Sequence, residues 1–300
     1  DQGLVTVWET ETHKMMLMNS TVIGAEYSDS HARDQAAFSG MALMQAVWFM
    51  VSQTGVRPAS ALCVGLGAGT VPSFLISKGV DVDVVEHSRA VLQAAESHFL
   101  YGATGHQRHA HVADAHDFLF AEPPRFGRAG IDGKPAYDAV VLDLFDGEDP
   151  ARLLTTQLFE RVKATWIRRG GAVVVNVVAF WTGEHVALAR AVVRTLRASF
   201  AHVRAFVDRD PSEQTDEPAN IVSFASDRPF GFDAPPYAED DQSVDWMWAN
   251  FQQWEVLQAE DELRDEDGGD GGLLLSADTA DAARARLGAA GAAVAAGMRE

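Results

Sequence analysis

The chain has 300 residues, 47% hydrophobic and 22% charged, so it can bury a full-sized core, and a wholly disordered or fibrous chain is excluded. Acidic residues outnumber basic ones 43 to 24, and the net charge of −19 makes nucleic acid an unfavourable partner, because phosphate backbones are repelled. No stretch reaches the roughly 18 consecutive apolar residues that a membrane span needs.

The N-terminal segment predicts a β-hairpin followed by a helix. Residues 4–8 and 15–23 are rich in strand-forming side chains and flank the polar stretch ETETHK, which is typical of a hairpin with a long turn. Residues 33–53 carry apolar side chains on more than one helical face, which predicts a well-buried helix that Gly55 and Pro58 end.

The central segment alternates between strand and helix patterns. The predicted strands are 61–66, 80–86, 109–114, 137–145 and 171–178. The predicted helices are 71–78, 89–99, 155–168 and 184–199, and a closing antiparallel pair is predicted at 202–208 and 219–226. This alternation indicates a mostly parallel sheet with helices on both faces.

The composition changes after about residue 230. An acidic, proline-rich linker is followed by residues 244–263, which predict a helix. Its apolar stripe consists of Val244, Met247, Phe251, Trp254 and Leu257. Two alternatives stay open for this stripe. It packs on the body of the same chain, or the helical segment Trp246–Leu257 binds a protein partner. An acidic spacer and an alanine-rich end follow.

A glycine-rich loop follows the first central strand. Gly65, Gly67 and Gly69 allow the backbone to turn tightly and approach a ligand. Glu86 ends the next strand, where a carboxylate can accept hydrogen bonds from ribose hydroxyls. No Gly-Lys-Ser/Thr follows the loop, so it is not a phosphate-binding P-loop, although its spacing alone allows a nicotinamide dinucleotide.

Two more acids follow predicted strands. Asp114 ends the third strand and Asp143 the fourth. Because ligands of open α/β sheets bind outside the carboxyl ends of the strands, we expect these acids, the glycine loop and Glu86 to meet at one crevice. The histidines form no metal constellation: His109 and His111 share one strand face without a third ligand, so no metal site is expected.

The order GLGAGT, VVEHS, VADAHDFL and YDAVVLDLFDGEDP resembles the spermidine-synthase-like branch of the class I S-adenosylmethionine-dependent methyltransferases. The resemblance covers roughly residues 1–230. It implies an α/β protein with a Rossmann-like class I methyltransferase sheet, an N-terminal β-hairpin and helix extension, and, outside the resemblance, an acidic helical C-terminal tail. The expected divisions are 1–57, 58–230 and 231–300. The resemblance also allows a homodimer.

The resemblance implies site residues. Those for the cofactor are Gly65, Gly67, Ala68, Gly69, Glu86, Asp114, Ala115 and Asp143. Glu86 would hold the ribose, and Asp114 with Ala115 would meet the adenine amino group. Asp143 stands where aminopropyltransferases place the aspartate that deprotonates the attacking amine, and Asp146 is a second catalytic candidate.

Two departures from the family pattern concern its ligands. Ala68 stands where the family has an aspartate, near the amine end of decarboxylated S-adenosylmethionine. An aspartate there would repel the carboxylate of S-adenosylmethionine, so its absence favours S-adenosylmethionine as the cofactor. In the polyamine-binding segment, Asp34 is kept, but Gln35 and Gly40 replace glutamates and Phe38 replaces a tyrosine. Asp34 and Gln35 are the substrate candidates, and specific putrescine binding is disfavoured.

The leading hypothesis is therefore methyl transfer from S-adenosylmethionine to a nitrogen of a cationic protein segment or small amine, which the acidic chain would attract. The alternatives are a non-catalytic subunit of a larger complex, and a polyamine aminopropyltransferase that uses decarboxylated S-adenosylmethionine. We expect an intracellular, soluble protein. Because the chain starts at Asp1 rather than at a methionine, cytoplasm and organelle both stay open.

Overall fold

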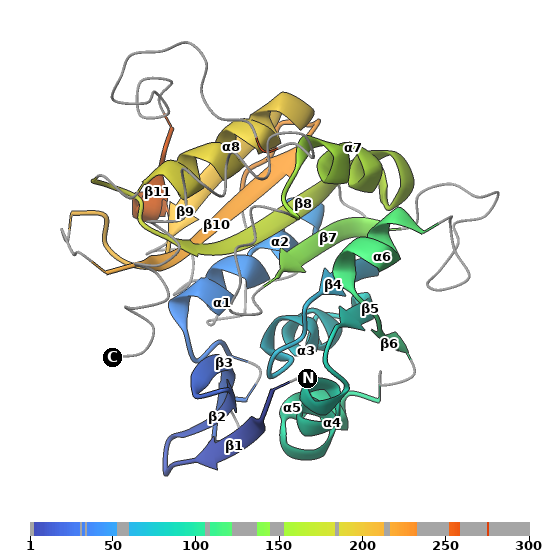
Figure 1. Ribbon diagram of the computed structural model, residues 1–300, viewed down its shortest axis with the longest axis vertical. Coiled ribbons are helices and arrows are strands. Elements are labelled where there is room, and N and C mark those ends of the chain that lie inside the picture. Colours follow the sequence, from blue (N-terminus) through green and yellow to red (C-terminus); the bar gives the residue numbers. More distant parts are fainter. Residues whose placement is uncertain are drawn as a thin grey trace.

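The computed structural model describes residues 3–30, 32–33, 35–52, 60–105, 109–121, 137–144, 153–183, 186–212, 217–232, 252–258 and 275. Within this part of the chain, a three-stranded antiparallel sheet lies beside a larger α/β body built on an eight-stranded sheet (Figure 1). None of the described helices combines the length and apolarity needed to cross a membrane.

The strands of the large sheet are β4 (Ser60–Val64), β5 (Asp81–Glu86), β6 (Ala110–Val112), β7 (Tyr137–Asp143), β8 (Ile167–Ala179), β9 (His202–Val207), β10 (Ala219–Ser226) and β11 (Glu255–Val256). They lie in the order β11-β9-β10-β8-β7-β4-β5-β6. The run from β8 to β6 is parallel, whereas β10 is antiparallel to both β8 and β9. The predicted parallel sheet and its closing antiparallel pair are confirmed.

Helices cover both faces of this sheet. One face carries α6 (Ala115–Phe120), α7 (Thr156–Thr165) and α8 (Ala187–Ser199). The other carries α1 (Ser39–Gln45), α2 (Val47–Ser52), α3 (Thr70–Ser77), α4 (Arg89–His98) and α5 (Leu100–Ala103). All five residues of β4 are buried, with Leu62 in the core on one face and Cys63 in the core on the other. A strand covered by helices on both faces has a continuous run of apolar residues, and this is why residues 61–66 predict a strand.

Polar residues at the strand ends start the helices that follow. The Ser88 side chain accepts a hydrogen bond from the Val91 N–H at the start of α4. The Asp114 side chain caps α6 in the same way through the Asp117 N–H. Capping of this kind satisfies donors that have no partner within the helix. It also places both side chains at the carboxyl edge of the sheet.

The N-terminal segment contains the expected hairpin and a third strand that was not expected. These are β1 (Val5–Glu9), β2 (His13–Met18) and β3 (Thr21–Tyr27), paired antiparallel. The prediction of one strand over 15–23 was wrong, because Asn19 and Ser20 adopt φ of 48° and 71°. Two successive residues with positive φ make the tight turn that the twist of a hairpin favours.

A buried carboxylate holds this small sheet to the body. Glu26 on β3 is 2% exposed, and its Oε1 accepts from the Arg33 Nε at 3.1 Å and Nη2 at 2.6 Å. Its Oε2 accepts the Leu100 N–H at 2.7 Å, at the start of α5. Charge-assisted hydrogen bonds to both oxygens fix the sheet against the end of α4.

The helix predicted over 33–53 begins later and is divided. The first helical residue is Ser39, and α1 and α2 are separate helices around Ala46. Because Arg33 is bound to Glu26, the helix begins only beyond Arg33 along the chain. The ion pair joins residues from two elements and is not visible in a helical pattern.

The helix predicted over 244–263 is wrong where the structure describes it. Residues 252–254 form a single 3₁₀ turn, and β11 then pairs with β9. Glu255 binds Arg204 through two hydrogen bonds of 2.9 and 2.7 Å, and Leu257 has a φ of 56°, outside any right-handed helix. Leu257 is 5% exposed, so this end of the segment packs on its own chain. Trp246 lies outside the described residues.

Candidate active site

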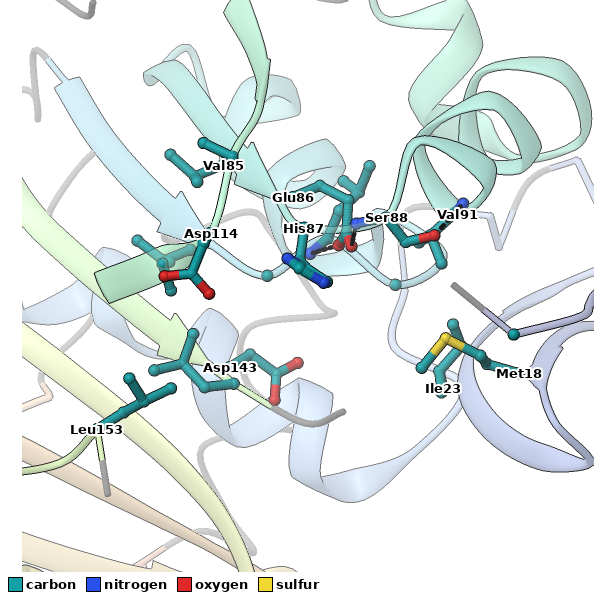
Figure 2. Close-up of a pocket in the computed structure, with 18 of the residues that line it drawn as sticks. Met18, Ile23, Val85, Glu86, His87, Ser88, Val91, Asp114, Asp143 and Leu153 are labelled. Atoms are coloured by element: carbon teal, nitrogen blue, oxygen red, sulfur yellow. Dashed lines mark hydrogen bonds between the residues drawn. The ribbon is translucent and has the colours of Figure 1, made fainter. Parts of the chain in front are cut away.

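A cavity of about 410 Å³ opens at the carboxyl ends of β4, β5 and β7 (Figure 2). It lies where the sheet order reverses, since β5 and β7 flank β4 on opposite sides. Open α/β sheets bind ligands at such a switch point. The volume falls in the range of roughly 300–1,000 Å³ that small-molecule sites occupy.

The glycine loop forms the floor of this cavity. Gly65 and Gly67 have φ of 95° and 54°, which favours glycine at both positions. A Cβ at Gly65 would overlap the carbonyl oxygen of Asp143, and one at Gly67 would overlap that of Ile23. The loop is therefore held between β7 and β3, and its glycines are needed by the fold itself.

Glu86 joins the glycine loop to the start of α4. Its Oε2 accepts the Leu66 N–H at 3.0 Å and its Oε1 accepts the Ser88 N–H at 2.7 Å. Burial raises the pKa of the Glu86 carboxyl, while these two N–H groups oppose the rise. The Gly67 N–H also lowers this pKa, so three backbone N–H groups act on a carboxylate with about four acceptor positions, and about one position is left for a ligand.

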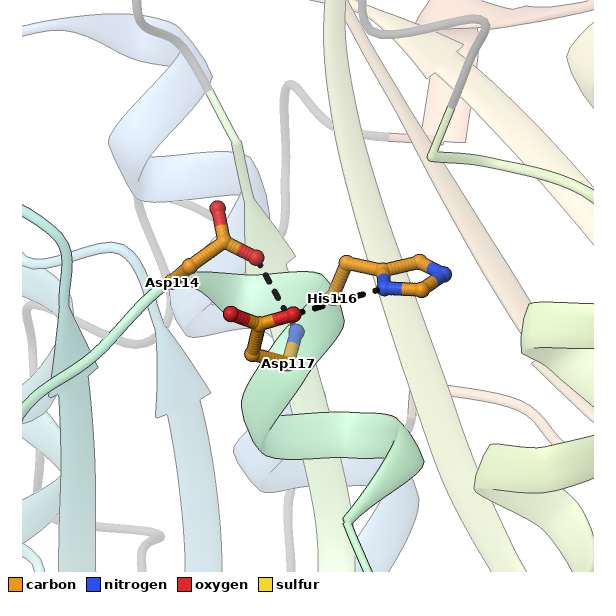
Figure 3. A group of neighbouring side chains, drawn as sticks. All are labelled: Asp114, His116 and Asp117. Atoms are coloured by element: carbon orange, nitrogen blue, oxygen red, sulfur yellow. Dashed lines mark hydrogen bonds and ion pairs between the residues drawn. The ribbon is translucent and has the colours of Figure 1, made fainter.

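Asp114 faces the cavity from the start of α6. Its Oδ1 accepts the Asp117 N–H at 3.0 Å, which leaves Oδ2 as an acceptor on the cavity side. With His116, the two aspartates form a group whose potential ligand atoms lie within 4.8 Å of one another (Figure 3). All three side chains are exposed. Histidine spacing in the sequence gives no indication of this group, because two of its three members are aspartates.

Asp143 ends β7 and belongs to a hydrogen-bonded chain of four side chains. The Asn176 Nδ2 donates to the Asp143 Oδ1 at 2.9 Å and to the Asn220 Oδ1 at 3.1 Å. The Asn220 Nδ2 donates in turn to the Asp208 Oδ2 at 2.7 Å. Burial raises the pKa of Asp143, and the hydrogen bond from Asn176 opposes this effect. Sequence reasoning missed the three partners, although Asn176 and Asn220 are isolated polar residues within apolar strands and Asp208 directly follows one.

The small N-terminal sheet supplies one wall of the cavity. Met18, Asn19 and Ile23 line it, and Figure 2 shows Met18 and Ile23 on the side away from Asp114 and Leu153. Next to them, Gly24 packs on Ala68, which is 3% exposed. The hairpin pattern gave no indication that this sheet closes the site, because strand patterns do not reveal what a sheet packs against.

The structure brings six of the predicted cofactor residues together. The ones that line the cavity are Gly65, Gly67, Glu86, Asp114, Ala115 and Asp143. Ala68 is turned toward β3, and Gly69 lies against Tyr101. Gln35 is exposed and is not among the described residues that line the cavity. Asp34 and Asp146 lie outside the described residues. The binding roles stay predictions.

A mostly parallel sheet with a glycine loop after β4 and acids at the ends of the next three strands is the arrangement that the resemblance in the sequence implies. Among solved structures, the chain is similar to a probable spermidine synthase from Corynebacterium glutamicum, with a TM-score of 0.64 at 15% identity over 91% of this chain and 92% of that one. The resemblance to the spermidine-synthase-like branch of this superfamily is thus confirmed at the level of the fold.

Two curated proteins are similar in sequence. A polyamine aminopropyltransferase from Vibrio vulnificus is 33% identical over 123 residues, which is 40% of this chain and 38% of that protein. An N-terminal histidine N-methyltransferase from Emericella nidulans is 26% identical over 191 residues, 61% of this chain and 32% of that protein. The chain therefore spans about a third of the length of the curated relatives it matches. No family model matches the chain.

Proposed function

We propose that this chain is an S-adenosylmethionine-dependent methyltransferase that acts on a nitrogen acceptor. The observation that carries the proposal is the convergence of the glycine loop, Glu86, Asp114 and Asp143 on one cavity at the switch point of the sheet. The named relatives support it, since one is a histidine N-methyltransferase and another an aminopropyltransferase, and both names denote transfer to nitrogen.

The residues present fit the cofactor. Glu86 keeps about one acceptor position for a ribose hydroxyl, and the Oδ2 of Asp114 offers one for an adenine amino group. Apolar contacts come from Ile23 on one side and Leu153 on the other. When bound, S-adenosylmethionine would supply a methyl group that its sulfonium already activates.

Asp143 would act on the acceptor. Its carboxylate lines the cavity, and the hydrogen bond from Asn176 fixes its orientation. A carboxylate whose pKa is raised by burial is a better proton acceptor than one in water. Asp143 would therefore remove a proton from a cationic amine and hold its nitrogen in line for transfer, while the N-terminal sheet excludes water.

Two features weigh against the alternatives. Ala68 is 3% exposed and packs against Gly24, so the aspartate that aminopropyltransferases carry would be buried at this position, which favours the cofactor with its carboxylate. A non-catalytic subunit would be expected to fill the crevice with side chains such as Phe180, yet Phe180 is not among the described residues that line this cavity. Phe145 lies outside the described residues.

Calorimetric titration tests the proposal. We expect S-adenosylmethionine to bind more tightly than its decarboxylated form, and Asp114→Asn to bind it less tightly than the wild type. Asp117→Asn is the matched control, because Asp117 follows on the same helix with its side chain 86% exposed. Tighter binding of the decarboxylated form would support aminopropyl transfer instead. Binding of neither form would support the non-catalytic subunit.

A further inference from the structure

One residue of the C-terminal segment, residues 259–300, is enclosed between α7 and α8. Leu275 is 0% exposed and belongs to the same core cluster as Leu154 and Leu158. Its backbone N–H donates to the Thr195 hydroxyl oxygen at 3.0 Å, and its carbonyl oxygen accepts the Thr156 N–H at 2.9 Å. With its side chain in the core and both backbone groups bonded to other elements, Leu275 anchors the chain to the two helices at this point.

The two threonines that bind Leu275 offer groups that suit a peptide backbone. Thr156 is the first residue of α7, where an N–H has no acceptor within its own helix. The Thr195 hydroxyl donates its hydrogen to the Ala191 carbonyl oxygen at 2.7 Å, so only its acceptor positions remain for another group. Thr195 is also 0% exposed. The site between the helices therefore presents one donor and one buried acceptor to the residue that docks there.

The start of α7 that binds Leu275 is continuous with a wall of the cavity at the candidate active site. Leu153 lines that cavity, and its carbonyl oxygen accepts the Thr155 N–H at 2.8 Å. Thr156, which binds Leu275, follows directly, and Leu154 within this short stretch is 1% exposed. Because a close-packed stretch of four residues has little freedom to deform, a shift at one end moves the other.

We propose that the site between α7 and α8 is a docking site for the chain's own C-terminal segment, and that docking of Leu275 holds Leu153 in place for cofactor binding. Leu275 is thus a positioning residue, and it lies outside the part of the chain that resembles the spermidine-synthase-like branch. The inference rests on the proposed function for the ligand of the cavity and adds a second site that controls it. Since such coupling is reciprocal, bound cofactor should strengthen the docking of Leu275 by the same factor.

Undocking would disturb the cavity wall in two ways. It would remove a leucine side chain from the core cluster, which leaves a void that neighbouring side chains shift to fill. It would also remove the acceptor of the Thr156 N–H, so α7 would lose a hydrogen bond at its first residue. Leu153 would then no longer be held in one position. A cofactor that binds would have to order this wall again, which lowers its affinity.

Hydrogen exchange followed by mass spectrometry tests the docking in the full chain without any cofactor. Leu275→Asp would place a charge in the core and release the segment. Peptides from residues 153–160 should then exchange about tenfold or more faster than in the wild type, because opening no longer has to undock a buried leucine. Thr195→Val, which keeps the shape but offers no acceptor, should give a smaller change of the same sign. Thr195→Ser, which keeps the hydroxyl, should stay near the wild type.

A synthetic peptide of residues 270–280 separates docking from general damage to the fold. Added to Leu275→Asp, it should restore part of the protection at residues 153–160, whereas the same peptide carrying Leu275→Asp should not. Glu160→Gln, at an exposed position on α7, serves as the control variant and should exchange like the wild type. Peptides from α4, which packs on the other face of the sheet, should be unchanged throughout.

Calorimetry tests the coupling to the cavity. We expect Leu275→Asp to bind S-adenosylmethionine about fivefold or more weakly than the wild type, which is the lower end of the usual coupling between two sites. Glu160→Gln should keep the wild-type affinity. In the wild type, S-adenosylhomocysteine should slow the exchange of residues 153–160, and in Leu275→Asp this slowing should be reduced.

Unchanged exchange of residues 153–160 in both Leu275→Asp and Thr195→Val would overturn the docking. Faster exchange with unchanged cofactor affinity would support the docking and overturn its coupling to the cavity. If the wild type binds no S-adenosylmethionine, the proposed function fails together with the coupling, while the exchange measurements still decide the docking. Should Leu275→Asp fail to fold, Thr195→Val and Thr195→Ser decide both questions by the same two measurements.

Discussion

Gly24 on β3 and Ala68 in the glycine loop are in direct backbone contact. A Cβ on Gly24 would stand 2.5 Å from the Ala68 nitrogen and 2.7 Å from its Cβ. Nearby, the Thr70 hydroxyl donates to the Ala25 carbonyl oxygen at 2.8 Å. The wall of the cavity and its floor thus form one packed unit, and the position of the N-terminal sheet determines the shape of the loop.

Enlarging Gly24 should therefore disturb both stability and ligand binding. We expect Gly24→Val to lower the free energy of unfolding by about 1–3 kcal/mol through overpacking, and to weaken S-adenosylmethionine binding because β3 moves off the loop. Denaturant unfolding and calorimetry check the two effects. Val22→Ala, on the same strand at a position 41% exposed, should leave the affinity unchanged. If Gly24→Val binds S-adenosylmethionine with unaltered affinity, the position of the N-terminal sheet does not affect cofactor binding.

Ala68→Asp tests why the loop lacks the aspartate of the polyamine enzymes. The side chain would be placed in a buried position against Gly24 with no described cation beside it, so a marked drop in the melting temperature is expected. Ala68→Ser, which adds one polar atom and no charge, should be milder. If Ala68→Asp folds normally and gains affinity for decarboxylated S-adenosylmethionine, the loop is more permissive than this packing indicates.

Asp143→Asn should raise stability and reduce activity. The folded state raises the pKa of Asp143, so its ionisation weakens the fold as pH rises from the ordinary carboxyl range through the raised value. The variant should therefore melt higher than the wild type at pH 7, and the difference should vanish below about pH 3, where the carboxyl is protonated in both states. A difference that grows toward acid pH would contradict this sign.

The same substitution removes the proton acceptor of the proposed reaction. The amide can still accept from Asn176, so the local geometry should be kept. We expect kcat to fall by about 10²–10⁴-fold, the usual contribution of a positioned acid or base, with little change in cofactor affinity. Steady-state kinetics measures kcat, and calorimetry on the same preparation measures the cofactor affinity. Full activity would assign Asp143 a purely structural role.

Glu86→Gln should weaken cofactor binding. Glutamine can accept from only one of the two N–H groups that Glu86 binds, so its NH₂ group would face either Leu66 or Ser88. An unmatched buried donor costs about 1–3 kcal/mol, which predicts roughly a tenfold or greater loss of affinity once the ribose contact is also removed. Glu96→Gln, on α4, provides the comparison. Equal affinities would show that Glu86 only supports the loop.

The exposed group of Asp114, His116 and Asp117 allows a test of metal dependence. Asp114 and Asp117 already share a capping hydrogen bond, and exposed acids of this kind are common without an ion. We expect neither EDTA nor His116→Ala to change cofactor affinity or activity by more than about twofold. Activity that EDTA abolishes and one divalent metal restores would assign this group a metal.

Local patterns predicted the α/β body well. The apolar run at 61–66 and the alternation at 80–86 became β4 and β5, since strands enclosed by helices carry a signal that needs no knowledge of their neighbours. Once these strands were predicted, the glycine loop and the acids could be assigned to the strand ends. Their meeting at one cavity could be expected, because parallel strands present their carboxyl ends on one edge.

Predictions failed where a distant contact outweighed the local pattern. The stripe around Trp254 suits a helix, but the Arg204–Glu255 pair and the free edge of β9 draw this segment into a strand. The helix expected from residue 33 starts late because Arg33 binds Glu26. In both cases an ion pair with a strand residue, Glu26 on β3 or Arg204 on β9, outweighs the small free energies of helix propensity.

By itself, the sequence determined the order of strands and helices, the glycine loop and the acidic strand ends, because these depend on side-chain periodicity and backbone freedom over a few residues. Only the tertiary structure decided that β3 lies on the loop at Gly24 and that Asn176 and Asn220 stand in line between Asp143 and Asp208. Such contacts depend on which strands become neighbours, and that choice is made by burial of the whole core.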